Sequence, residues 1–136
     1  MAGTKTRAKK TASSRAAGKD FGAVFAGLKK ILERYADSLF VKFDKPGNYY
    51  LESVSASWKG NRLFFGAAQI KKNYVSFYLM AVYAFPELLK GISPELKRRM
   101  QGKSCFNFTA TEEKLFGELS KLTGAGFQKY RAEKLL

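Results

Sequence analysis

The segment 49-YYLESVSASWKGNRLFFGAAQIKKNYVSFYLM-80 carries the strongest indication of the fold. It holds three runs of strand-forming residues, 49–58, 62–70 and 74–80, which are separated by the short turns KGN and KKN. In the third run, Val75, Phe77 and Leu79 share the apolar side, the period-two pattern of a half-buried strand. Because such short turns join neighbouring strands, the stretch predicts an antiparallel meander.

Helical patterns lie on both sides of these strands. Large apolar residues recur every three or four positions from Phe21 to Tyr35, directly after Asp20, a residue type that caps helices. The closing segment, 109–136, repeats this spacing, and the capping-box pair Thr109 and Glu112 predicts that its helix begins after Thr109. Between them, Ser93-Pro94 predicts the start of a short helix, and residues 104–108 predict a further strand. This order predicts an α+β fold with the N- and C-terminal helices on one face of an antiparallel sheet.

Charge and length divide the chain of 136 residues into a tail and one domain. Residues 1–19 are basic and poor in large apolar side chains, which predicts a disordered tail before a domain of residues 20–136. The whole chain carries 25 Lys and Arg against 11 Asp and Glu, a net charge of +14. This excess attracts nucleic acid, anionic surfaces or acidic partners, although it equally serves solubility. No apolar run is long enough to span a bilayer, so we expect no membrane partner.

Residue usage narrows the chemistry. The sequence has no histidine and one cysteine, Cys105. These facts exclude His-dependent triads and Cys/His zinc sites, and a lone thiol fits a reducing compartment such as the cytoplasm. A buried, structural Cys105 is the favoured interpretation over a reactive one. We therefore expect no metal site and no cofactor. An enzyme is possible but unsupported, because no paired acid-base constellation can be named, and the balance favours a non-enzymatic protein.

The step Gly102-Lys103-Ser104 has the form of the end of a nucleotide phosphate loop. That motif needs an earlier glycine, and Lys97 stands at its position. It also needs a strand before the loop and a helix after it, whereas the pattern here predicts the reverse. The step is therefore interpreted as the turn between a helix and a strand.

Polar and aromatic side chains predict a binding face on the sheet. The candidate ligand-binding residues are Tyr74, Ser76, Tyr78, Asn107 and Trp58. Together they would line a pocket in which hydroxyl and amide groups orient a ligand. The alternative is a face half covered by the short helices, with its hydroxyl groups in water.

Five cations could form a basic rim around this pocket and hold an anion: Lys71, Lys72, Arg98, Arg99 and Lys103. The cations at the end of the short helix have another explanation, because the helix dipole stabilises positive charge there.

The segments KKNYVSFYLM, LLKGISPELKRRMQGKSCFNF and LFGELSKLTGAGFQKY resemble the YdhG-like family, a domain of unknown function. The resemblance runs from about Phe21 to Tyr130. It implies a frataxin-like arrangement of helices on one side of an antiparallel sheet, and with it an iron-chaperone hypothesis. Frataxin-type iron binding uses an acidic first helix, whereas Lys29, Lys30 and Arg34 lie on this one. Repulsion between iron and these cations argues against that activity.

Three functional hypotheses result. The leading one is a non-enzymatic domain that binds an anionic or aromatic ligand, or an acidic partner, on the sheet face. The second is weak, non-specific nucleic-acid association through the basic tail and face. The third, disfavoured by the charge of +14, is the iron role.

Overall fold

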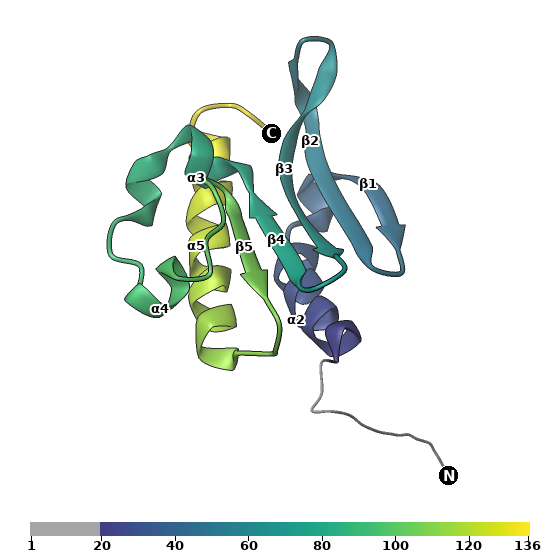
Figure 1. Ribbon diagram of the computed structural model, residues 1–136. Helices are drawn as coiled ribbons and strands as arrows, with labels where there is room; N and C mark the ends of the chain where they lie inside the picture. The colour runs from purple at the N-terminus through teal and green to yellow at the C-terminus, as the bar shows by residue number, and fades with distance from the viewer. Residues whose placement is uncertain (1–19) are drawn as a thin grey trace.

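An antiparallel sheet of five strands is the framework of the computed structural model, which describes residues 20–136 (Figure 1). The predicted disordered tail, residues 1–19, lies outside the described residues. The strands are β1 (Phe40–Lys45), β2 (Asn48–Trp58), β3 (Asn61–Ile70), β4 (Val75–Leu79) and β5 (Cys105–Phe108). Each strand pairs with the next one along the chain, so their order in the sheet is also their order in the sequence. The predicted meander is confirmed.

Two long helices, α2 (Phe21–Glu33) and α5 (Glu113–Ala132), lie on the same side of the sheet (Figure 1). The carboxylate of Asp20 caps α2, since its Oδ1 accepts a hydrogen bond from the backbone N–H of Ala23 at 3.0 Å. The α+β class and the placement of both helices on one face are therefore confirmed. A short 3-10 helix, Ala36–Ser38, connects α2 to β1.

The short helices pack beside α5. They are α3 (Met80–Ala84), the 3-10 helix Pro86–Leu89 and α4 (Pro94–Lys97), and each contacts α5. Ser93 caps α4 as expected, with its Oγ accepting from the N–H of Leu96 at 3.1 Å. The Gly102-Lys103-Ser104 step lies between α4 and β5, in the order that excludes a phosphate loop.

The start of α5 differs from the prediction. The helix begins at Glu113, and its N-cap residue, Glu112, makes no capping hydrogen bond with its side chain. Instead, the Glu112 carboxylate accepts two hydrogen bonds from Arg99, from Nε and Nη2, each 2.8 Å long. Because the Glu112 carboxylate is occupied by Arg99 and the helix begins one residue after it, the capping box predicted for Thr109 and Glu112 is wrong.

The hydrophobic core lies between the helices and one face of the sheet. Its fully buried side chains include Leu28, Leu51, Phe65, Phe77 and Leu119. The pairing of β2 with β3 shifts after Leu51, which makes a bulge at Phe65 and Gly66.

Gly66 allows α2 to lie close to this bulge. A Cβ at Gly66 would lie 3.1 Å from Leu32 Cδ2 and 2.9 Å from the carbonyl oxygen of Tyr78. Gly66 therefore combines a bulge position with the close approach of a neighbouring helix.

Two glycines of α5 provide a matched pair for testing the packing. A Cβ at Gly126 would lie 2.8 Å from Ala81 Cβ of α3, whereas a Cβ at Gly117 would meet nothing within 4 Å. We expect Gly126→Ala to lower the free energy of unfolding by about 1–2 kcal/mol, because overpacking outweighs the gain in helix propensity. Gly117→Ala gains about 0.5–1 kcal/mol from propensity alone. Urea unfolding measures both, and a stabilised Gly126→Ala variant would contradict the close approach of α3 and α5.

Candidate functional site: the uncovered face of the sheet

The face of the sheet opposite α2 and α5 carries no helix formed by residues 20–136 (Figure 1). We call this surface the open face. Strand pairing places two rows of side chains on it. The first row is Phe43, Tyr50, Ala67, Tyr78 and Cys105, one residue from each strand. The second row, one pair further along, is Asn48, Gln69, Ser76 and Asn107. The alternative interpretation, in which the short helices half cover this face, does not hold, because these helices pack against α5.

The second row is a chain of polar side chains across β2 to β5. Gln69 Nε2 donates to Asn48 Oδ1 at 3.1 Å, and Ser76 Oγ donates to Asn107 Oδ1 at 2.7 Å. Lys71 Nζ donates to Gln69 Oε1 at 2.9 Å. Because these side chains bond to one another, the row is held in a fixed arrangement without a ligand.

The first row is aromatic. The rings of Phe43 and Tyr50 meet edge to face with centroids 5.7 Å apart, and the ring of Phe64 lies 4.7 Å from that of Tyr50. Ala67 is fully buried although it lies on the open face, so the larger side chains on either side close over its methyl group. Burial, with a smaller effect of Glu52, raises the pKa of Tyr50, so its hydroxyl stays protonated at neutral pH. The rings of Phe43, Tyr50 and Phe64 thus form one half-buried cluster, and the half-buried ring of Tyr78 lies beyond Ala67.

Cations lie over these rings. Lys42 Nζ is 5.6 Å from the ring centroids of both Phe43 and Tyr50, and Lys45 Nζ is 5.1 Å from that of Phe43. Lys71 Nζ is 5.9 Å from the ring of Tyr78. These are cation–π distances. They place positive charge beside the aromatic rings along three of the strands.

Another cation, Arg62, and one acid, Glu52, lie near Phe40, at the start of β1. Arg62 Cζ is 3.8 Å from the ring centroid of Phe40. Glu52, which pairs with Phe40 across the strands, is 7% exposed and lies 3.6 Å from Lys42 Nζ. The acid therefore neutralises Lys42 in part, and the rest of the open face keeps its positive charge.

The structure brings together three of the predicted ligand-binding residues. Ser76, Tyr78 and Asn107 lie on adjacent strands of the open face, and Tyr74 precedes β4 and is 37% exposed. Trp58 does not join them. It pairs with Asn61 at the tip of the β2–β3 hairpin, whereas Tyr74 lies beyond the other end of β3, about 30 Å away along the strand.

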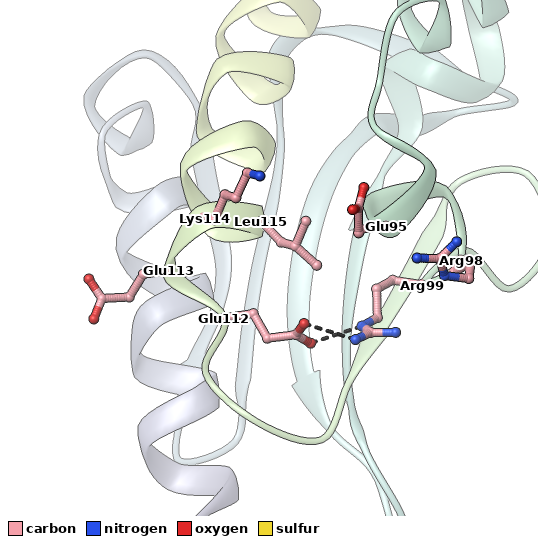
Figure 2. Close-up of a pocket in the computed structure, with 7 residues that line it drawn as sticks. All are labelled: Glu95, Arg98, Arg99, Glu112, Glu113, Lys114 and Leu115. Atoms are coloured by element: carbon pink, nitrogen blue, oxygen red, sulfur yellow. Dashed lines mark hydrogen bonds and ion pairs between the residues drawn. The ribbon is translucent and has the colours of Figure 1, made fainter.

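The predicted basic rim is divided among several places. Lys71 lies on the open face, and Lys72 is exposed in the turn before β4. Lys103 Nζ lies 5.9 Å from the ring of Tyr83 on α3. Arg98 and Arg99 line a separate cavity between α4 and the start of α5 (Figure 2). The rim predicted from sequence is therefore wrong as a single site.

The cavity that contains Arg98 and Arg99 mixes both signs of charge. Its charged residues are Glu95, Arg98, Arg99, Glu112, Glu113 and Lys114. Figure 2 shows the guanidinium of Arg99 facing the carboxylate of Glu112, and this hydrogen bond raises the pKa of Arg99. An anion entering here would have to displace Glu112. Arg99 is therefore a structural cation.

Several residues of the open face were missed by sequence reasoning. Phe43, Tyr50 and Lys42 were absent from the candidates, although Tyr50 alternates with buried Tyr49 and Leu51. That alternation could have placed Tyr50 on the same face as Tyr78. The signal for Lys42 was absent, because a bulge between Val41 and Phe43 changes the register of β1.

Cys105 ends the aromatic row and is half-buried. Its thiol lies 3.3 Å from Asn107 Oδ1. Burial raises the pKa of Cys105, and hydrogen bonds from Ser76 and Tyr78 and the charge of Lys71 oppose this effect only in part. The thiol thus stays protonated at neutral pH, as expected for a structural cysteine. Within residues 20–136, no group of three or more acidic or thiol side chains is placed to hold a metal ion.

None of the helices that the structure describes is long and apolar enough to cross a bilayer. Comparisons of the chain with family models, with curated proteins and with solved structures give no significant match. The resemblance to the YdhG-like family stays a prediction.

The raised pKa of Cys105 predicts slow alkylation. Because the thiolate is the nucleophile, native protein should react with iodoacetamide at pH 8 several-fold more slowly than protein unfolded in urea. Since the folded chain holds this proton more tightly, stability should fall as pH rises above the ordinary thiol pKa. Mass spectrometry of the alkylated fraction over time measures the rates, and a native rate equal to the unfolded rate would contradict the burial.

Because Arg99 pairs with Glu112, replacing Arg99 should lower the free energy of unfolding and leave ligand binding unchanged. Its side chains are 36% and 29% exposed, so solvent screens the charges, and we expect Arg99→Gln to cost about 0.5–1 kcal/mol. Arg98→Gln, at an exposed neighbour, should change stability by less than about 0.5 kcal/mol. Urea unfolding compares the two. An Arg99→Gln variant with unchanged stability would contradict the structural role.

Proposed function

We propose that this protein is a non-enzymatic binding domain whose open face takes a ligand that combines an aromatic ring with negative charge. The observation that carries the proposal is Lys42, whose ammonium group lies over the rings of Phe43 and Tyr50 on an uncovered sheet. A flat ring can stack on these aromatic side chains, and the anionic part of the same molecule can pair with the lysine.

The polar row would orient such a ligand. The amides of Asn48, Gln69 and Asn107 offer donors and acceptors beside the rings. The bond between Gln69 and Asn48 and the bond from Ser76 to Asn107 keep them ordered. Such preorganisation reduces the entropy lost on binding. Lys71 would supply a second cation, because it reaches both Gln69 and the ring of Tyr78.

A binding role suits the chemistry of the face better than catalysis. Glu52, the acid beside Tyr50, is held by Lys42, and the sequence has no histidine to act as a general base. We also propose that the protein is a member of the YdhG-like family, on its sequence resemblance, and that it is cytoplasmic, because its single cysteine fits a reducing compartment. Iron binding forms no part of the proposal, because Lys29 and Lys30 lie on α2.

Three probes separate the two parts of the proposed ligand. Adenosine 5′-monophosphate carries a ring and a charge, adenosine carries the ring alone, and inorganic phosphate carries the charge alone. The monophosphate at ten times its Kd should stabilise the protein by about 1.4 kcal/mol and raise Tm by about 5 °C. Each of the other two at the same concentration should raise Tm less.

A matched pair of tyrosines locates the binding. Tyr78 lies on the open face with Lys71 Nζ 5.9 Å from its ring, and Tyr83 lies on α3 with Lys103 Nζ 5.9 Å from its ring. Tyr78→Leu should remove most of the shift given by the monophosphate, and Tyr83→Leu should leave it. If phosphate alone gives the whole shift, or if both variants behave alike, the open face is not the ligand site. An acidic peptide that binds in place of the monophosphate would favour a protein partner.

A further inference from the structure

We infer that the ligand of the open face is a single-stranded nucleic acid, an inference that rests on the proposed function. Each nucleotide of such a strand offers an aromatic base with a phosphate beside it, which is the combination that the open face is suited to bind. The face repeats the matching arrangement, with Lys42 and Lys45 beside Phe43 on β1 and Lys71 beside Tyr78 on β4.

The extent of the aromatic row favours a polymer over a single nucleotide. From Phe43 on β1 to Tyr78 on β4 the rings of the row span three inter-strand spacings, about 14 Å in all. Stacked nucleotides follow one another every 3.4 Å or so, and extended ones are further apart. The row is therefore long enough for several consecutive nucleotides, and one mononucleotide would leave most of it uncovered.

Flat aromatic side chains favour unpaired bases over a duplex. Rings such as Tyr50 and Tyr78 can stack only on a base whose face is exposed, which base pairing and stacking in a double helix prevent. Reading a duplex through its major groove usually takes a protruding helix or ribbon. The two long helices lie on the other side of the sheet (Figure 1). The β2–β3 hairpin extends beyond the rest of the sheet (Figure 1), so a duplex laid on the open face itself would meet its cations only.

The lysines of the open face would exchange ring contacts for phosphate contacts when a nucleic-acid strand binds. Lys45 and Lys71 lie over rings at 5.1 and 5.9 Å, so each can turn its flexible side chain to a phosphate when a base takes the ring. Lys42 can do the same, although Glu52, 3.6 Å from its Nζ, neutralises part of its charge. When these lysines bind phosphates, they displace counterions from the nucleic acid, so the affinity falls as the salt concentration rises. The polar row is occupied by its own hydrogen bonds, so we expect weak preference among base sequences.

Fluorescence anisotropy of the full chain tests the inference. The probes are labelled twelve-nucleotide oligothymidylate, oligouridylate, a mixed-sequence duplex of the same length and thymidine monophosphate. We expect both single strands to bind at least tenfold more tightly than the duplex and the mononucleotide. The two single-strand arms show whether DNA or RNA is preferred.

Two substitution pairs assign this binding to the open face. Tyr78→Leu should weaken single-strand binding about 5- to 100-fold, the effect of losing one stacked base, and Tyr83→Leu should not. The double change Lys42→Gln with Lys45→Gln should reduce the slope of log K against log salt by about 1.4, for two lost phosphate contacts. The double change Lys114→Gln with Lys121→Gln, on exposed positions of α5, is the charge-matched control.

The outcomes separate the two proposals. Equal binding of duplex and single strand, unaffected by Tyr78→Leu, overturns the inference and assigns the binding to net charge. If the monophosphate is bound at Tyr78 without any gain from a longer strand, the proposed function stands and the inference fails. If Tyr78→Leu affects none of the probes, both fail.

Discussion

The packing of α2 and α5 against a single face of the sheet is the constraint on which the rest of the structure depends. It needs close contacts that larger side chains would prevent, at Gly66 beside Leu32 and at Gly126 beside Ala81. The resulting core takes the apolar side of β2 to β5, including Leu51 and Phe77. The short helices extend the same layer by packing along α5. All the helices of residues 20–136 therefore pack on one side of the sheet, and none of them covers the other side.

An uncovered sheet face with five aromatic rings would ordinarily promote aggregation. Here the rings of Phe40, Phe43, Tyr50, Phe64 and Tyr78 are accompanied by cations that keep the surface wet and positively charged. The same pairing gives the face its chemistry, because it sets an aromatic surface beside positive charge. The acids of the chain lie mainly elsewhere, and Glu112, for example, is used to hold Arg99. Any basic protein surface carries positive charge. The open face differs because its cations lie beside aromatic rings.

The sequence predicted the fold well because period-two alternation, short turns and helical spacing are local signals. The period-two alternation puts Val75, Phe77 and Leu79 on one apolar side, and all three are fully buried. The site was predicted in part: Ser76, Tyr78 and Asn107 share the open face. Trp58 is not among them, because the length of β2 and β3 carries it to the far end of their hairpin. Arg99 is not among them either, because it pairs with Glu112, 13 residues away in the sequence. Neither feature is a local signal. Lys42 could not be found, since the bulge in β1 that alters its register has no residue signature.

Whether the rings of the open face contact the ligand is measured most directly by aromatic proton–carbon NMR during titration with oligothymidylate. Stacked bases shift the resonances of the rings that they cover. The account predicts progressive upfield shifts for Tyr50, Tyr78 and Phe43, with no change for Tyr83 on α3 or for Tyr130, which is buried between α5 and the sheet. Shifts at Tyr83 equal to those at Tyr78, or unchanged resonances for Tyr50 and Tyr78 at saturation, would contradict it.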